Sequence, residues 1–204
     1  MWNRTENQIG LVLIRHGETA ANRERRYLGV TDEPLSDKGR SLLLSRKEDG
    51  CYPNVQALFS SPMRRCLETA EILYPGMRPV IIPEWREMDF GRFEYCNYDE
   101  LKHDREYQAW IDSGGTIPFP GGEDRETFLA RCGKGFLKML GDLEQRNGIT
   151  AGMIVHGGTI MTLLSCYYGG AYFDYQVKNG GGYFCQIKGW GEDAQITQLE
   201  ELGR

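Results

Sequence analysis

Two histidine–glycine pairs are the residues in this chain best suited to chemistry. His16 lies between Arg15 and Gly17, and His156 is followed by Gly157. An arginine fork matches the oxygens of a phosphate, and a glycine lets the backbone approach a ligand closely. The pattern indicates an oxyanion pocket that contains imidazole. The alternative, that both histidines are structural turn residues, is about as frequent for such spacing alone.

Each candidate follows a short apolar run that is typical of a buried strand. The run of residues 11–14 is followed by Arg15, and the run of residues 153–155 is followed by His156. A third run, residues 55–59, is followed by a helix expected to be capped by Ser61 and to run from residue 62 to about 74, carrying Arg65. In open α/β sheets, ligands bind beyond the carboxyl ends of the strands. We therefore expect both histidines and the arginines to share one site.

The alternation of strands and helices predicts an α/β fold, a three-layer α/β/α sandwich with a mostly parallel sheet. Ser36 should cap another helix, whose leucines at 42, 43 and 44 are expected to face the sheet. Further strands are predicted at residues 80–82, 183–187 and 196–199, and another helix at 159–168.

The chain is expected to form a single domain over residues 1–204 with one small helical insertion. Between residues 88 and 148 the pattern changes to two helical stretches, 98–113 and 123–145. We expect this insertion to cover the active site and form the substrate side of its pocket.

Charge and composition limit the possible partners. The chain has 204 residues, with 24 Lys and Arg against 29 Asp and Glu and a net charge of −5, which argues against nucleic acid. No apolar run approaches the roughly 18 residues that a membrane helix needs. The six cysteines contain no C-x-x-C pair, so we expect reduced thiols and a cytoplasmic location. The expected partner is a small phosphorylated metabolite; a homodimer is compatible with the sequence.

Such a pocket suits phosphoryl transfer, which needs positioning and positive charge more than covalent chemistry. A histidine among arginines stays neutral and can attack phosphorus. Glu87 is placed to protonate the leaving oxygen, because a nearby phosphate dianion would raise its pKa. The arginines can supply the charge, so we expect no metal and no cofactor.

The ordered blocks Arg15-His16-Gly17-Glu18-Thr19, Asp32-Glu33-Pro34-Leu35-Ser36, Ser60-Ser61-Pro62-Met63-Arg64-Arg65-Cys66 and Val155-His156-Gly157-Gly158 resemble the histidine phosphatase, or phosphoglycerate mutase-like, superfamily. The resemblance implies that His16 is a nucleophile that becomes phosphohistidine. It implies that Arg15, Arg65 and His156 complete the phosphate-binding core and that Glu87 is the acid/base residue. Asn22 matches an outer phosphate contact.

The insertion bears on the substrate. It lacks the adjacent arginine pair of the mutase branch and is rich in aromatic residues, of which Tyr95 and Trp110 are expected to bind substrate. It is similar to the alpha-ribazole phosphatase branch, which acts on a benzimidazole nucleotide in cobalamin assembly. We therefore expect a phosphomonoester hydrolase. A cofactor-dependent phosphoglycerate mutase and a non-catalytic phosphoester-binding member of the family remain the alternatives.

Overall fold

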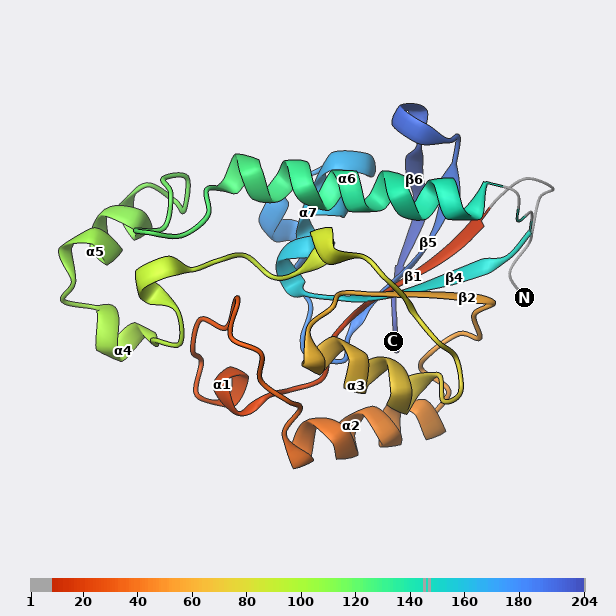
Figure 1. Ribbon diagram of the computed structural model, residues 1–204, viewed down its shortest axis with the longest axis horizontal. Helices are drawn as coiled ribbons and strands as arrows, with labels where there is room; N and C mark the ends of the chain where they lie inside the picture. Colours follow the sequence, from red (N-terminus) through yellow and green to blue (C-terminus); the bar gives the residue numbers. More distant parts are fainter. Residues whose placement is uncertain (1–8, 145, 147, 204) are drawn as a thin grey trace.

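The sheet has six strands in the order β3-β2-β4-β1-β5-β6 in the computed structural model, which describes residues 9–144, 146 and 148–203 (Figure 1). The strands are β1 (Ile9–Arg15), β2 (Ala57–Ser60), β3 (Val80–Ile81), β4 (Thr150–Val155), β5 (Gly182–Lys188) and β6 (Gln195–Glu201). The first four in spatial order are parallel, whereas β5 pairs antiparallel with both of its neighbours. The sheet is therefore mostly parallel, as predicted.

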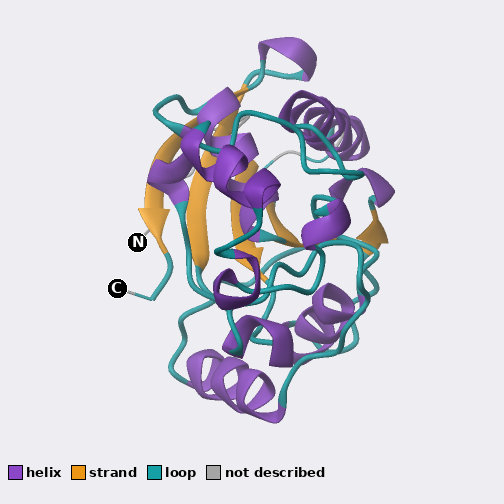
Figure 2. Ribbon diagram, turned by 90° about the vertical axis from the view of Figure 1, so that its left-hand side faces the viewer, coloured by secondary structure: helices purple, strands orange, loops and turns teal. Residues whose placement is uncertain are grey.

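Helices cover both faces of the sheet (Figures 1 and 2). The α-helices are α1 (Ala20–Arg23), α2 (Asp37–Glu48), α3 (Arg64–Leu73), α4 (Tyr98–Leu101), α5 (Arg105–Asp112), α6 (Arg125–Leu143) and α7 (Gly157–Tyr167). Short 3₁₀ turns are η1 (Pro83–Trp85), η2 (Gly91–Phe93), η3 (Tyr172–Tyr175) and η4 (Gly191–Asp193). The α2–α3 layer packs on one face and the α6–α7 layer on the other, which confirms the three-layer sandwich.

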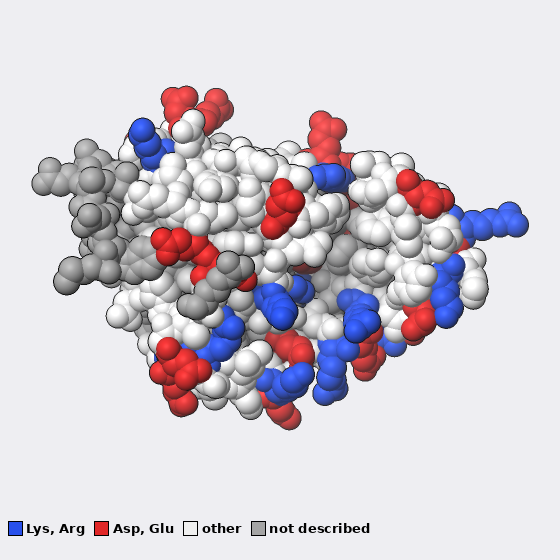
Figure 3. Space-filling view, turned by 180° about the vertical axis from the view of Figure 1, so that it is seen from behind, with Lys and Arg blue, Asp and Glu red and all other residues white. Residues whose placement is uncertain are grey.

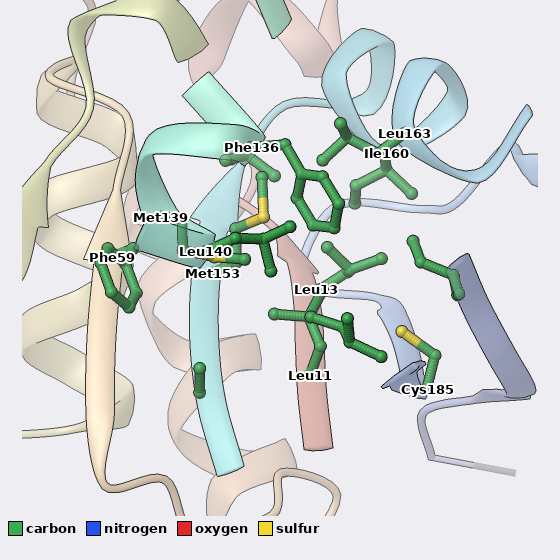
Figure 4. Packing of buried hydrophobic residues seen from close by; sticks show 14 of the residues in the cluster. Leu11, Leu13, Phe59, Phe136, Met139, Leu140, Met153, Ile160, Leu163 and Cys185 are labelled. Carbon is green, nitrogen blue, oxygen red and sulfur yellow. The ribbon is translucent and has the colours of Figure 1, made fainter. Parts of the chain in front are cut away.

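Strand β1 shows why two layers form. Its side chains alternate between faces, so Leu11 and Leu13 pack with α6 and α7, whereas Val12 and Ile14 pack with α2 and α3. Figure 4 shows the first cluster, where Phe136 of α6 and Ile160 of α7 point toward the strands. Burying both faces fixes the strand ends, and with them the residues that follow each strand.

Two local predictions about the α2–α3 layer need correction. Only Leu43 of the three leucines in α2 is buried, because successive helical residues point about 100° apart; Leu42 and Leu44 are exposed. Helix α3 begins only at Arg64, so Met63 takes the cap position and has no side chain that can cap; the Ser61 hydroxyl bonds to His156 and accepts the Met63 N–H at 3.3 Å. The cap of α2 by Ser36 is confirmed, since its hydroxyl accepts the Gly39 N–H at 3.0 Å.

The stretch predicted as one helix over residues 98–113 is two helices, α4 and α5. They are separated because Asp104 caps α5, accepting the N–H groups of Glu106 and Tyr107. Both helices lie beyond the end of the sheet and pack in a separate cluster with Phe93 and Phe128 (Figure 1). The second half of α6 instead packs on the sheet.

All six cysteines are free thiols. Within the described ranges, the helices are all too short or too polar to cross a membrane. On the face that Figure 3 displays, basic and acidic side chains are interspersed over the surface.

Candidate active site

The carboxyl ends of β1 and β4 bring the two histidines together. The His16 N–H donates to Val155 O at 3.0 Å, and the two imidazole rings lie 5.2 Å apart, centre to centre. His16 is 3% exposed and His156 is fully buried, so both rings are almost completely shielded from solvent. The structure therefore places at one edge of the sheet two residues that are 140 positions apart in the sequence.

His16 is held in one tautomer. Its Nδ1 lies 2.8 Å from Gly17 O, and a carbonyl can only accept, so Nδ1 carries the proton. Burial and the neighbouring Arg65 and Arg15 guanidiniums hold the pKa of His16 well below 6.5. The ring is thus neutral, and its Nε2 has a free lone pair, which is the state that a nucleophile requires.

The two arginines are anchored by main-chain carbonyls. Arg65 donates to Thr31 O and Gly29 O, each at 2.9 Å, and Arg15 donates to Val177 O at 2.8 Å. Within the described part of the chain, the Nε–H groups of both arginines are buried and have no hydrogen-bond partner. Buried donors of this kind are rarely left unsatisfied, which favours an anionic ligand between them.

His156 lies opposite His16 and is bonded to Ser61. Its Nε2 is 2.8 Å from the Ser61 hydroxyl, and its Nδ1 is 4.0 Å from a carboxylate oxygen of Glu87. Burial, followed by the charge of Arg65, holds the pKa of His156 well below 6.5. His156 also precedes α7, whose first N–H groups have no side-chain cap and can bind an anion at Gly157.

Glu87 lies on the irregular chain between η1 and η2. One carboxyl oxygen accepts the Met88 N–H at 3.0 Å, and burial raises the pKa of Glu87 above its usual value. Gly158 packs closely against this carboxyl, because a Cβ there would lie 2.7 Å from that oxygen and displace it. A carboxyl whose pKa is raised in this way is suited to act as an acid beside the anion site.

Asn22 and Gly17 lie beside the nucleophile in different roles. Asn179, which the sequence analysis did not single out, donates to Asn22 Oδ1 at 2.9 Å and to His16 O at 3.2 Å. The Asn22 Oδ1 is therefore occupied as an acceptor, which leaves the amide nitrogen as the hydrogen-bond donor of this side chain. Gly17 is packed closely, since a Cβ there would lie 2.7 Å from Leu43.

A cavity of about 360 Å³ opens from Arg15, Glu87 and Gly157. Trp110 lines it, as expected, but its ring is also stacked on Tyr107 at an interplanar angle of 19°. Most of the other lining side chains are apolar or aromatic: Tyr27, Met88, Phe90, Ile117, Phe119, Met161, Tyr172, Phe173 and Val177.

The structure does not place Tyr95 in this cavity. Its backbone is left-handed, with φ of 61°, and its hydroxyl donates to Glu33 at 3.0 Å. The ring lies beside Arg26 and is 40% exposed. Phe173 and Tyr172, which sequence reasoning missed, line the wall instead. Their aromatic side chains are the only sequence signal for a ring-binding role. They lie in η3, after α7, and therefore outside the insertion in which substrate-binding residues were expected.

Among residues 9–144, 146 and 148–203, no three His, Cys, Asp or Glu side chains are arranged to hold a metal ion. The positive charge at the candidate site comes from Arg15, Arg65 and the first turn of α7.

We expect His16 and His156 to remain neutral at pH 6.5, where an ordinary histidine is half protonated. This expectation follows from the lowered pKa values of the two histidines, since each ring is mostly protonated only at a pH below its own pKa. Long-range ¹H–¹⁵N spectra between pH 8 and 6 should show a neutral Nδ1–H tautomer for His16 throughout. An imidazolium signal for His16 at pH 6.5 would contradict this geometry.

Comparisons with known proteins agree with this fold and identify the family. Residues 11–188 match the family model of the histidine phosphatase superfamily, branch 1. The Arabidopsis thaliana phosphoglycerate mutase-like protein 4 is 30% identical, over 75% of this chain and 68% of its own length. The chain therefore belongs to the histidine phosphatase superfamily.

Other relatives carry different activities in their names. Phosphoserine phosphatase 1 of Hydrogenobacter thermophilus is 28% identical over 64% of this chain, and the match spans 63% of that relative, just under two thirds. The crystal structure of the alpha-ribazole phosphatase from Shigella flexneri superposes with a TM-score of 0.76 at 25% identity, covering 93% of this chain and 95% of that one. The family thus includes similar proteins with several substrates.

Proposed function

We propose that this protein hydrolyses phosphomonoesters through a phosphohistidine at His16. The observation that carries the proposal is a neutral His16, with its lone pair on Nε2, between two arginines whose Nε–H groups have no other partner in the described chain. Relatives named as phosphatases support this reaction class.

The first step forms the intermediate. Arg15, Arg65 and the N-terminus of α7 bind the phosphate oxygens, and His16 Nε2 attacks phosphorus as the bond to the ester oxygen breaks. Glu87 gives its proton to that oxygen, so the alcohol leaves neutral. His156, bonded to Ser61, contacts the phosphoryl oxygens from the opposite side.

The second step reverses the roles. Glu87, now a carboxylate, accepts a proton from a water that attacks the phosphohistidine, and phosphate leaves as His16 becomes neutral again. The two steps together consume one water and restore every residue. A mutase would instead hold a second hydroxyl in place of that water.

We propose a ring-bearing phosphate as substrate, with alpha-ribazole 5′-phosphate as the leading compound and cobalamin assembly as the corresponding role. The largely aromatic cavity wall supports this choice, because aromatic faces bind planar rings. The similar Shigella flexneri structure supports it as well.

One observation favours a second candidate, an acidic substrate such as phosphoserine or phosphoglycerate. Arg125 lines the cavity and stacks over Tyr172 at 4.5 Å, and no carboxylate in the described chain pairs with it. A substrate carboxylate could bind there. Values of kcat/KM for alpha-ribazole 5′-phosphate, phosphoserine and phosphoglycerate decide between the two candidate substrates. For phosphoglycerate, the rate of phosphate release is compared with the rate of interconversion of its isomers, which distinguishes a phosphatase from a mutase.

Replacing Phe173 with alanine should lower kcat/KM for the ring-bearing substrate by about 5- to 150-fold, the ~1–3 kcal/mol expected if a base stacks there. Phe173 is 55% exposed, so its loss should leave the fold intact. Tyr98→Ala, at an equally exposed aromatic outside the cavity, is the control. Equal losses on phosphoserine, or an unchanged value for alpha-ribazole 5′-phosphate, would count against the ring-binding wall.

A further inference from the structure

Arg131 of α6 reaches back to the chain segment that carries Glu87. Its Nη1 donates to Glu84 O at 2.7 Å and to Arg86 O at 2.6 Å, and its Nη2 donates to Glu87 O at 3.0 Å. A single guanidinium therefore fixes three carbonyls within four residues. Glu84 lies within η1, whereas Arg86 and Glu87 follow it in a stretch, residues 86–90, that belongs to no helix or strand.

Glu123 fixes the guanidinium in turn. Its two carboxylate oxygens accept from Arg131 Nε at 2.6 Å and Nη2 at 2.7 Å, a bidentate pair whose side chains are 13% and 10% exposed. The Glu123 N–H also donates to Asp89 O at 2.9 Å. Arg131 thus ties residues 84–87 to α6, and the main chain of Glu123, just before that helix, holds Asp89 on the other side of Glu87.

We infer that the Glu123–Arg131 pair positions the proton donor: it acts through Glu87 and does not touch the substrate. The inference rests on the acid role proposed for Glu87. Proton transfer needs the carboxyl within about 2.6–3.2 Å of the leaving oxygen, and a misplacement of about 1 Å can cost ~10²-fold. Gly158, which leaves room for the Glu87 carboxyl, shows how closely that group is packed.

Arg131→Lys separates geometry from charge. Lysine keeps the positive charge near Glu87, but a compact ammonium cannot reproduce the planar fork that joins three carbonyls and a carboxylate. We expect kcat/KM for an alkyl phosphate, which needs the proton, to fall about 10- to 100-fold. For 4-nitrophenyl phosphate, whose leaving group needs no proton, the value should change less than about 3-fold.

A double-mutant cycle with Glu87→Gln makes the test specific. If Arg131 acts through Glu87, adding Arg131→Lys to Glu87→Gln should cost less than about 2-fold on the alkyl phosphate. The control is Arg46→Lys, a partly buried arginine that donates to Leu202 O far from the site and should leave both substrates unaffected.

Equal losses on both substrates, or additive losses in the cycle, would overturn the inference while leaving the acid role of Glu87 intact. If Glu87→Gln itself shows no preference for leaving group, the acid role falls and the inference with it. Should the lysine variant not fold, Glu123→Gln, which weakens the bidentate pair and keeps its shape, must show the same selective loss.

Discussion

Replacing His16 with alanine should abolish turnover of every phosphomonoester, lowering kcat/KM by ~10⁴-fold or more, because the proposed intermediate forms on its Nε2. His103→Ala is the matched control, since His103 is exposed on the insertion. Steady-state assays of both variants with 4-nitrophenyl phosphate measure the effect, and thermal melts check that each is folded.

Turnover by the His16→Ala variant within tenfold of the parent would contradict the assignment of the nucleophile. A loss confined to KM would mean that His16 only binds phosphate. His156, 5.2 Å away, would then be the remaining imidazole able to attack.

Glu87→Gln should lower kcat/KM for an alkyl phosphate by ~10²–10⁴-fold and for 4-nitrophenyl phosphate far less. The amide keeps the shape of the side chain and can still accept the Met88 N–H, but its N–H groups are too weakly acidic to protonate the leaving oxygen. Glu18→Gln is the control, since the Glu18 carboxylate is engaged by Ser36 and Lys38. Equal losses on both substrates would remove Glu87 from the acid role.

The raised pKa of Glu87 sets the direction in which kcat/KM for an alkyl phosphate changes with pH. Burial raises the pKa of Glu87, so the carboxyl keeps its proton at a pH where an ordinary glutamate has lost it. For an alkyl phosphate, kcat/KM should therefore fall as the pH rises through that raised pKa. The Glu87→Gln enzyme should lack this limb.

The sequence predicted the parts of the site that depend on strand ends. His16 and His156 each follow a buried strand, and parallel neighbours end at the same edge, so their meeting follows from the sheet. Arg65 was expected nearby because α3 follows β2 directly. These predictions need only apolar periodicity and the rule that ligands bind at the carboxyl edge.

The substrate wall could not be predicted in the same way. Tyr95 and Phe173 are both exposed aromatics, and only the backbone path decides that the first contacts Glu33 and the second lines the cavity. Ser61 was predicted to cap a helix because serine before proline is typical of a helix start. Its bond to His156, 95 residues away, is not visible in the local sequence. The contacts of Arg131 could not be predicted for a similar reason. Its partners are main-chain carbonyls about 45 residues upstream, and every residue type has such a carbonyl.

Trapping the phosphoenzyme tests the central proposal most directly. The Glu87→Gln variant is the best trap, because an aryl phosphate can still phosphorylate His16 while the water that removes the phosphoryl group is no longer activated. Mixed with ³²P-labelled 4-nitrophenyl phosphate and quenched in base, it should carry one acid-labile, base-stable phosphoryl group per chain on the peptide that contains His16. Label on a different peptide, or equal label in the His16→Ala/Glu87→Gln double variant, would contradict a phosphohistidine at His16.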